Sequence, residues 1–292
     1  MAKRFVIQFF ILCTAVAGYW WYVLVWVPLE TEVPMVRVHF LDVGQGDSIL
    51  IETPSGRQVL VDAGRDGAVS AALNHVMQAS DKHIDALVMT HPDADHIGGF
   101  AAVLDQYDIS SVIHSFIPAE TQVYRAVMER VYAKEQAGKI AVHQVDRAQQ
   151  FILDDVTLSL LWPLDRTVAD KNAASVVLLV QYGDQQVLLT GDAPVAVEDV
   201  LFNVFPDLLA DIELVKAGHH GSRTSFSQAM LEKAEPHSIV FSYGEGNPYK
   251  HPHHTVLNRT AAYVAEHPDA RVYRTVDGTV SFCITKENTI RC

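Results

Sequence analysis

The sequence predicts an α/β protein in which two β-sheets pack face to face between outer helices, a four-layer α/β/β/α sandwich. Two observations support this fold. Strands joined by hairpins come first and alternating strands and helices follow, and this order occurs twice along the chain. Several strands also end in polar loops that hold most of the unusual histidines. Because crossover helices cover the faces of a sheet, two such halves give two sheets with helices outside.

The first half opens with a segment in which apolar and polar side chains alternate, as in a half-buried strand. Turn residues at 44–47 and 54–57 then separate two further strands. Apolar residues at helical spacing predict the helices that follow. The predicted strands are 36–43, 48–53, 58–62, 83–89, 112–117 and 140–145, and the predicted helices are 68–80, 99–107 and 121–134.

The second half repeats the order. Residues 151–162 read as a hairpin with its turn at Asp154 and Asp155, and Gly183-Asp184 turns a second hairpin between 175–182 and 185–190. The remaining predicted strands are 212–216, 237–242 and the stretch 271–284, and the predicted helices are 194–204, 225–234 and 255–266.

Composition limits the class of partner. The chain has 292 residues, of which 49% are hydrophobic, more than enough to bury a core. Lys and Arg total 22 against 35 Asp and Glu, so the formal net charge is -13. This balance argues against loose binding of nucleic acid or anionic lipid over the whole surface. A local cationic site remains compatible with it, because bound metal ions can be the largest charges in a pocket.

The first 29 residues predict a membrane anchor ahead of a hydrolase domain at 30–292. Residues 5–27 carry no charge, which is long enough to span about 30 Å of hydrocarbon as a helix. Lys3 and Arg4 favour a cytoplasmic N-terminus, which gives a single-pass protein of the cytoplasmic membrane with an extracytoplasmic domain. A cleaved signal peptide with its site at 15–17 is the alternative, and it also exports the domain.

Three cysteines are present, and two of them lie near the C-terminus. If Glu287 and Asn288 form a two-residue hairpin turn, Cys283 and Cys292 fall opposite each other and can form a disulfide in an oxidising compartment. Two free thiols near the terminus are the alternative.

The stretch THPDADHIGG indicates a metal site. His91, Asp93, Asp95 and His96 follow the apolar strand 83–89, so they lie at its carboxyl end, where α/β proteins bind ligands. In extended backbone, alternate residues of this set point to one side. The alternative is a helix that begins at Asp95 as its N-cap, beside exposed polar residues.

Three further clusters follow later strands. Asp192 can bridge two metal ions or cap the helix that begins near Pro194. His219 and His220 lie between glycines, and we expect one or both to be ligands. The segment 247–254 is rich in hydrogen-bond donors that can hold an anionic substrate, with a polar turn as the alternative. Its candidate residues are Asn247, Tyr249, Lys250, His251 and His253.

The order of these motifs, HxDxDH, TGD, GHHGS and NxYxHPH, resembles that of the metallo-β-lactamase fold family. Within it, HFLDVGQGDSILI and VLVDAG resemble the extracytoplasmic hydrolase domain of the ComEC proteins of DNA uptake, from about residue 36 to 278. The resemblance implies that His91 and Asp93 bind one metal ion and that Asp95 and His96 bind a second. It makes Asp192 the bridging carboxylate and His219 the last histidine ligand. It also places His220 and Ser222 behind the ligands or against the substrate, and matches Asn247, Tyr249, His251 and His253 to the closing loop.

The chain departs from this family in three ways. ComEC proteins have many membrane spans, whereas this chain has one, so we expect any channel to be a partner membrane protein. Ala173 replaces an asparagine near a ligand position, which leaves the first metal ion less fully held. Lys250 replaces a glycine and adds a cation that can bind phosphate.

The ligand set predicts the chemistry. Its three aspartates favour Mn²⁺ or Mg²⁺ over a histidine-only zinc cage, although Zn²⁺ is also compatible. Three carboxylates and two divalent ions leave a charge of about +1, which suits a phosphodiester. We therefore expect a metal-dependent phosphodiesterase or nuclease that acts on DNA outside the membrane. Asp95 would orient the nucleophile, and His220 or His251 would protonate the leaving group.

Two other functions fit the same residues: an accessory DNA-binding module with a degenerate metal site, and a hydrolase of a small ester, lactone or lactam. Metal content separates the first from an enzyme, and relative rates on a phosphodiester and nitrocefin separate the second. The sequence leaves the oligomeric state open.

Overall fold

The structure, a computed structural model, describes residues 33–292, and Met35–Cys292 form one compact unit. The predicted membrane anchor lies outside the described residues. Within 33–292, no helix combines the length and the apolar character that a membrane crossing requires.

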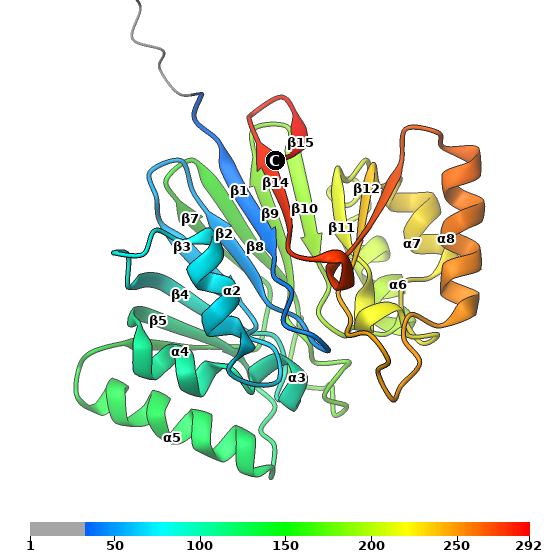
Figure 1. The fold of residues 1–292 in the computed structure, drawn as a ribbon. Helices are drawn as coiled ribbons and strands as arrows, with labels where there is room; N and C mark the ends of the chain where they lie inside the picture. Colours follow the sequence, from blue (N-terminus) through cyan, green and yellow to red (C-terminus); the bar gives the residue numbers. More distant parts are fainter. Residues whose placement is uncertain (1–32) are drawn as a thin grey trace, which may run out of the picture. The chain divides into compact units, whose positions relative to one another are not determined.

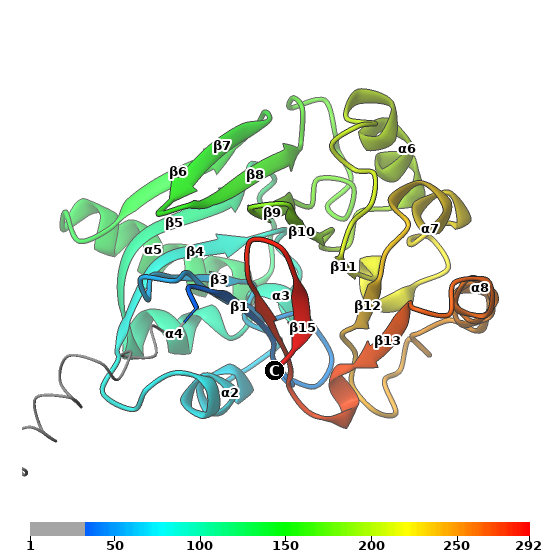
Figure 2. The ribbon, with the colours of Figure 1, turned by 90° about the horizontal axis from the view of Figure 1, so that it is seen from above.

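Two β-sheets form the centre of this unit (Figures 1 and 2). Within residues 33–292, the first sheet has eight strands in the order β15-β14-β1-β2-β3-β4-β5-β6, and the second has seven in the order β13-β12-β11-β10-β9-β8-β7. The strands of the first sheet are β1 (Val36–Phe40), β2 (Ile49–Glu52), β3 (Gln58–Val61), β4 (His83–Met89), β5 (Asp108–Ser115), β6 (Ala141–Val145), β14 (Val280–Ile284) and β15 (Thr289–Arg291). Those of the second are β7 (Gln149–Leu153), β8 (Val156–Trp162), β9 (Val177–Tyr182), β10 (Gln185–Leu189), β11 (Leu214–Lys216), β12 (Ser238–Phe241) and β13 (Arg271–Arg274).

Helices cover the outer face of each sheet, as Figures 1 and 2 show. The first sheet carries α2 (Ala68–Val76), α3 (Ala94–Ile97), α4 (Phe100–Gln106) and α5 (Gln122–Gln136). The second carries α6 (Val195–Val204), α7 (Gln228–Ala234) and α8 (His254–Glu266). Two short 3₁₀ turns, Gly218–Gly221 and Thr275–Asp277, complete the elements of the described chain.

Three apolar layers hold these four layers together. One lies between the sheets and includes Val38 and Phe40 of β1 and Val180 of β9. The second joins the first sheet to α2–α5, and the third joins the second sheet to α6–α8. Strand β4 contributes Val88 to the first layer and Leu87 to the second, because successive side chains of a strand point to opposite faces. The predicted sandwich of two sheets between helices is confirmed.

The parallel strands bring the polar loops together. Strands β3, β4, β5 and β6 are parallel in the first sheet, and β10, β11, β12 and β13 are parallel in the second. Asp62, His91, Asp192, His219 and Ser242 all follow the carboxyl ends of such strands. Because parallel strands end at the same edge of a sheet, these residues meet at one edge of the sandwich.

The C-terminal hairpin differs from its prediction by one residue. Strand β14 pairs with β15 so that Cys283 lies opposite Ile290, and the turn is at Lys286 and Glu287. The expected turn at Glu287 and Asn288 is therefore wrong. The Thr285 hydroxyl explains the shift, because it accepts hydrogen bonds from the backbone nitrogens of Glu287 (3.4 Å) and Asn288 (3.1 Å). Cys283 and Cys292 nevertheless form a disulfide, with 5.4 Å between their Cα atoms.

We expect a thiol titration of the denatured full chain to find one reactive thiol before reduction and three after it, because only Cys13 is outside the disulfide. Closing a loop of this length is worth about 2–3 kcal/mol in the chain-entropy account, so reduction should lower the unfolding midpoint. Three thiols before reduction, in protein purified from an oxidising compartment, would contradict the pairing.

Candidate metal centre

A buried carboxylate, Asp62, organises the loop that follows β4. It accepts hydrogen bonds from the Thr90 backbone nitrogen (2.9 Å) and the Thr90 hydroxyl (2.6 Å). Its Oδ2 also lies 2.7 Å from His96 Nδ1. Since a carboxylate only accepts, His96 Nδ1 donates and His96 Nε2 is free to bind a cation, the arrangement in which a carboxylate orients a metal-binding histidine.

Glycines let the backbone fold closely around this loop. A Cβ atom at Gly98 would lie 1.8 Å from the Arg65 carbonyl oxygen, and one at Gly99 would lie 2.0 Å from that of Ala63. The glycine pair after His96 therefore allows these backbone segments to pack closely. The short helix α3, which was not predicted, begins inside the motif and carries Asp95 and His96.

His220 approaches from the second sheet. It lies in the 3₁₀ turn after β11, where His219 and His220 adopt φ of 49° and 53°. His220 Nδ1 lies 2.9 Å from the Ser242 carbonyl oxygen at the end of β12. That oxygen only accepts, so Nδ1 donates and His220 Nε2 points toward the centre.

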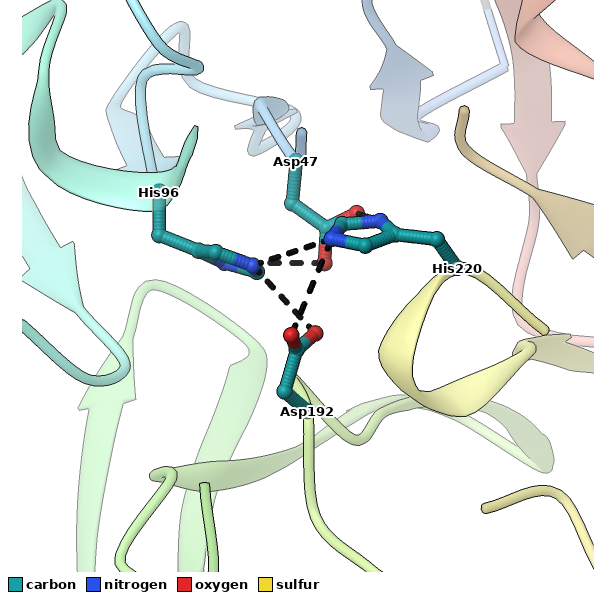
Figure 3. Close-up of side chains that lie close together, drawn as sticks. All are labelled: Asp47, His96, Asp192 and His220. Carbon is teal, nitrogen blue, oxygen red and sulfur yellow. Dashed lines mark hydrogen bonds and ion pairs between the residues drawn. The ribbon is translucent and has the colours of Figure 1, made fainter. Parts of the chain in front are cut away.

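Four buried side chains meet at this point: Asp47, His96, Asp192 and His220 (Figure 3). One ligand atom from each lies within 4.8 Å of the others. Figure 3 shows the two imidazole rings and the two carboxylates pointing toward one another. The distance from His96 Nε2 to His220 Nε2 is 3.2 Å, and the distance from His96 Nε2 to Asp192 Oδ1 is also 3.2 Å.

This arrangement fits a metal ion. Both Nδ1 atoms are held as donors, so the two facing Nε2 atoms carry lone pairs unless a proton or another cation lies between them. Asp95 Oδ2 is 3.6 Å from His220 Nε2 and adds a further oxygen. His91 Nε2 is buried and has no hydrogen-bond partner among the described residues. Two or three imidazole nitrogens with carboxylate oxygens are a donor set for a divalent ion such as Zn²⁺ or Mn²⁺.

The structure also brings together the residues predicted for the first metal ion. His91 Nε2 lies 3.8 Å from Asp93 Oδ2 and 3.8 Å from Asp192 Oδ2. Asp192 thus lies between this His91–Asp93 half and the His96–His220 half. A cation already contacts the first half, because the Lys171 ammonium binds Asp93 Oδ1.

His219, the histidine predicted as the last ligand, lies at the rim of the centre. Its Nε2 is 3.4 Å from Asp192 Oδ2, and its side chain is 23% exposed. The centre of the His251 ring lies 5.4 Å from that of the His219 ring. Both histidines of the GHHGS motif therefore reach Asp192, but His220 is the more deeply buried of the two.

A buried lysine controls the charge of Asp47. Lys216 ends β11, is fully buried, and places its ammonium against the Asp47 carboxylate. The ammonium also donates to the Gly191 carbonyl oxygen (2.9 Å) and lies 3.7 Å from Asp192 Oδ1. Burial alone would raise the pKa of Asp47, but Lys216 together with His220 and His96 lowers it to about 2. Asp47 is therefore an anion that already has a cationic partner.

The predicted closing loop lies beside the centre. Asn247 shapes it, because its side-chain nitrogen donates to the carbonyl oxygens of Gly244 (2.9 Å) and His251 (2.6 Å) and its oxygen accepts from the His251 nitrogen (2.9 Å). The Tyr249 ring stacks on His251 at 5.8 Å, and its hydroxyl contacts Arg65. A cleft of about 690 Å³ lies here, and its lining includes Asn247, Lys250, His251 and Arg274.

Two other predicted substrate residues have structural contacts. The His253 Nδ1 atom caps α8 by accepting from the Thr255 nitrogen (3.4 Å). The Ser222 hydroxyl forms a hydrogen bond with the Thr224 hydroxyl (3.0 Å). Contact of either residue with substrate stays a prediction.

Sequence reasoning missed Asp47, Asp62, Lys171 and Lys216. Asp62 follows the apolar strand β3 directly, and Lys216 is the last residue of β11. A charged residue at the end of a buried strand was therefore a usable signal, the same one that identified His91 and Asp192. Lys171 gave no such signal, because it lies in the irregular segment before β9.

The pKa values of the histidines separate them by position. Burial alone would lower the pKa of His220, but Asp192 and Asp47 outweigh it and raise the value to about 9. For His96, Asp192 and Asp62 likewise overcome burial and raise the pKa well above its usual range. Burial lowers the pKa of His91 well below its usual range, and burial together with His219 lowers that of His251 to about 4. His96 and His220 are therefore protonated more readily than a free histidine, whereas His91 and His251 are neutral at neutral pH.

We expect the metal-free protein to lose stability as the pH rises from about 6.5 to 9. The pKa of His220 is 6.5 when unfolded and about 9 when folded, so its stabilising contribution is complete below pH 6.5 and disappears as the pH passes 9. The loss is about 3 kcal/mol. Urea unfolding of chelator-treated protein at pH 6.5, 7.5 and 9 measures it. An unfolding midpoint that stays constant or rises over this range would contradict the assignment.

The sequence and the fold match a known class of protein. Residues 41–244 match the metallo-beta-lactamase superfamily, and the chain belongs to that superfamily. It is also similar to "ComE operon protein 3" of Bacillus subtilis, with 30% identity over 268 residues, 84% of this chain and 33% of that protein. "Competence protein ComA" of Neisseria gonorrhoeae is 33% identical over 224 residues, 76% of this chain and 29% of that one. The predicted resemblance to this family and to ComEC-type competence proteins is confirmed.

The chain spans about a third of the length of these relatives. Among solved structures, CmlA, a diiron beta-hydroxylase from Streptomyces venezuelae, covers 90% of this chain at a TM-score of 0.56. The match uses 55% of CmlA, and the identity is 15%, so the likeness shows the fold alone.

Proposed function

We propose that the chain is a metal-dependent phosphodiesterase that acts on DNA outside the cytoplasmic membrane, in a role similar to that of ComEC-type proteins. The observation that carries this proposal is the pair of imidazole nitrogens, on His96 and His220, that face each other at 3.2 Å beside Asp192. Such a donor set is suited to a divalent ion, and the superfamily consists largely of metal-dependent hydrolases.

The residues divide into two halves around Asp192. His96, His220 and Asp95 would hold one divalent ion, and His91 and Asp93 a second, with Asp192 shared and His219 available at the rim. Oxygen-rich donors favour Mn²⁺ or Mg²⁺, and Zn²⁺ is compatible. Bound divalent ions lower the pKa of water and stabilise the charge that develops on a phosphodiester.

The protein's own residues would position and recognise the substrate. Asp95 is mostly buried yet keeps 17% of its side chain exposed, so it can orient a water molecule at the mouth of the centre. Lys250 lines the adjacent cleft and can attract phosphate groups despite the net charge of -13, whereas Arg274 of the same cleft is paired with Asp277 at 2.9 Å. His220 would hold the ion through Nε2 while its Nδ1 donates to the Ser242 carbonyl oxygen, so neither ring nitrogen is left for proton transfer. His251 is the remaining candidate for a proton-transfer role: it is neutral at neutral pH and can accept a proton or a hydrogen bond beside the centre.

The location and the partners belong to the same proposal. A domain anchored by residues 1–29 and exposed outside the cytoplasmic membrane would meet incoming DNA. A separate membrane channel protein would then carry the DNA across. Support for this context comes from the names of the relatives, which are competence proteins.

A substrate panel tests the reaction class. With Mn²⁺, Mg²⁺ or Zn²⁺, we expect the full chain to hydrolyse bis-p-nitrophenyl phosphate and DNA at least tenfold faster than nitrocefin or a simple lactone. Faster turnover of nitrocefin or the lactone would move the assignment to a small-molecule hydrolase. No turnover of any substrate with any of the three metals would count against catalysis.

A second candidate function is an accessory DNA-binding module. The observation that favours it is the contact of the Lys171 ammonium with Asp93, a predicted metal ligand. Metal content decides between the two, because a module with a degenerate centre would purify with less than one metal ion per chain and would bind DNA without cutting it.

A further inference from the structure

We propose that Lys171 is a built-in competitor for metal at the His91–Asp93 half of the centre, so that the two halves bind metal with unequal affinity. The chain would then hold one ion tightly and a second only when the Lys171 ammonium leaves Asp93. This inference rests on the proposed function, because it concerns the metal centre of the same site.

The first step is the geometry of Asp93. The Lys171 ammonium contacts Asp93 Oδ1, while Asp93 Oδ2 lies 3.8 Å from His91 Nε2. An ion bound by His91, Asp93 and Asp192 would therefore share the Asp93 carboxylate with an ammonium. Ammonium and metal ion are both cations, so each weakens the binding of the other.

The segment that carries Lys171 is fixed against the centre. The Trp162 ring nitrogen donates to the Ala173 carbonyl oxygen (2.6 Å), and the Ser115 hydroxyl donates to that of Ala174 (2.8 Å). The Ser175 hydroxyl accepts from the Asp192 backbone nitrogen (3.2 Å). This segment therefore lies directly beside the shared carboxylate.

A third ligand from this segment would complete the donor set of the His91–Asp93 half, but the segment places the Lys171 ammonium there instead. Ala173 and Ala174 carry no donor atom, and Ser175 is already bonded to the Asp192 backbone. Asn172 carries an amide oxygen, but its side chain makes no hydrogen bond with the predicted ligands in the described part of the chain, whereas the Lys171 ammonium contacts Asp93. The His91–Asp93 half thus combines an ammonium with a small donor set, and both features lower its affinity for a metal ion.

The other half is not blocked in this way. Lys216 lies 3.7 Å from Asp192 Oδ1, but its ammonium is held by the closer contacts with Asp47 and the Gly191 carbonyl oxygen. His96 Nε2 and His220 Nε2 face each other directly, with Asp95 and Asp192 beside them. The tight ion therefore belongs to this half.

The expected size of the effect follows from the exposure of the pair. The side chains of Lys171 and Asp93 are 43% and 30% exposed, so the lysine can swing into water and the pair by itself is weak. Bringing a divalent ion beside the ammonium is nevertheless unfavourable. We expect Lys171 to lower the affinity for the second metal ion by about tenfold to a hundredfold.

Calorimetric titration of the chelator-treated full chain with Mn²⁺ tests the proposal. Wild type should bind one ion tightly and a second ten- to a hundredfold more weakly. Lys171→Gln, which removes the charge, should bind the second ion about tenfold to a hundredfold more tightly than wild type does. Lys171→Arg, which keeps the charge, should resemble wild type. The matched control is Lys286→Gln. Lys286 is 52% exposed and forms an ion pair with Asp155 (2.9 Å between Nζ and Oδ2), and this pair is not part of the centre.

Each result of the titration decides the proposal. Identical binding curves for wild type and Lys171→Gln, each with two ions, would overturn the role of Lys171 and leave the proposed function standing. Identical curves with one ion each would overturn it as well, because removal of the competitor would have opened no second site. No binding of Mn²⁺, Mg²⁺ or Zn²⁺ to either protein would overturn the proposed function, and the competition with it. A thermal melt of each variant confirms that it is folded.

Discussion

We expect Asp192→Asn to lower kcat/KM for the proposed phosphodiester hydrolysis by about a hundredfold to a thousandfold, the size of losing a principal electrostatic contact of an active site. Asp192 is the residue that the two halves of the centre share. Its carboxylate lies 3.2 Å from His96, 3.4 Å from His219 and 3.7 Å from His220. Asparagine keeps the size of the side chain but removes the negative charge, so both halves lose affinity for a cation.

Steady-state kinetics on bis-p-nitrophenyl phosphate and metal content after desalting measure this effect. The matched control is Asp184→Asn, because Asp184 lies exposed at the turn between β9 and β10, at the opposite end of the strand that leads to Asp192. It should leave both quantities unchanged. Activity of Asp192→Asn within tenfold of wild type would show that this carboxylate does not organise the reaction.

We expect Lys216→Met to destabilise the protein by about 3–5 kcal/mol, because it removes the ammonium that lies against the buried Asp47 carboxylate and leaves only the more distant His220 and His96 beside it. Lys216 is fully buried and Asp47 is 1% exposed, so water cannot replace the lost contact. The corresponding fall in the melting temperature is about 10 °C for a domain of this size. Methionine has a similar length, and the loss therefore comes from charge rather than from an empty volume.

The double variant Asp47→Asn with Lys216→Met separates charge from packing. It removes both members of the pair and should recover part of the lost stability, because no isolated charge stays buried. Urea unfolding without metal measures the free energy of unfolding of wild type, Lys216→Met and the double variant. The control is Lys139→Met, which changes an exposed lysine and should alter stability by less than about 0.5 kcal/mol. A double variant less stable than Lys216→Met would contradict the pairing.

The sheet was predictable where the chain has a clear period. Strand β4 has the same bounds in sequence and structure, His83–Met89, because a buried apolar run lies between polar segments. Helix α3 was missed because its four residues, Ala94–Ile97, are too few to show a helical period. The C-terminal turn was misplaced because the Thr285 hydroxyl, rather than the turn pair itself, selects the register.

The centre was predictable where one local motif supplies it. His91, Asp93, Asp95 and His96 lie within six positions after one strand, and the structure keeps them at one place. Pairs that join distant segments were not predictable in the same way. Lys216 meets Asp47, and Lys171 meets Asp93, only because the ends of strands from both sheets meet at one edge. Such contacts depend on strand order, which a single sequence does not reveal.

Metal removal and restoration tests the central claim most directly. Full-length protein treated with a chelator and then desalted should lose hydrolysis of bis-p-nitrophenyl phosphate, and addition of Mn²⁺ should restore it in proportion to the ions bound. The first ion bound should carry the larger part of the metal-dependent stabilisation, since it enters the His96–His220 half. Phosphodiesterase activity that persists when metal analysis finds no bound ion would contradict the account.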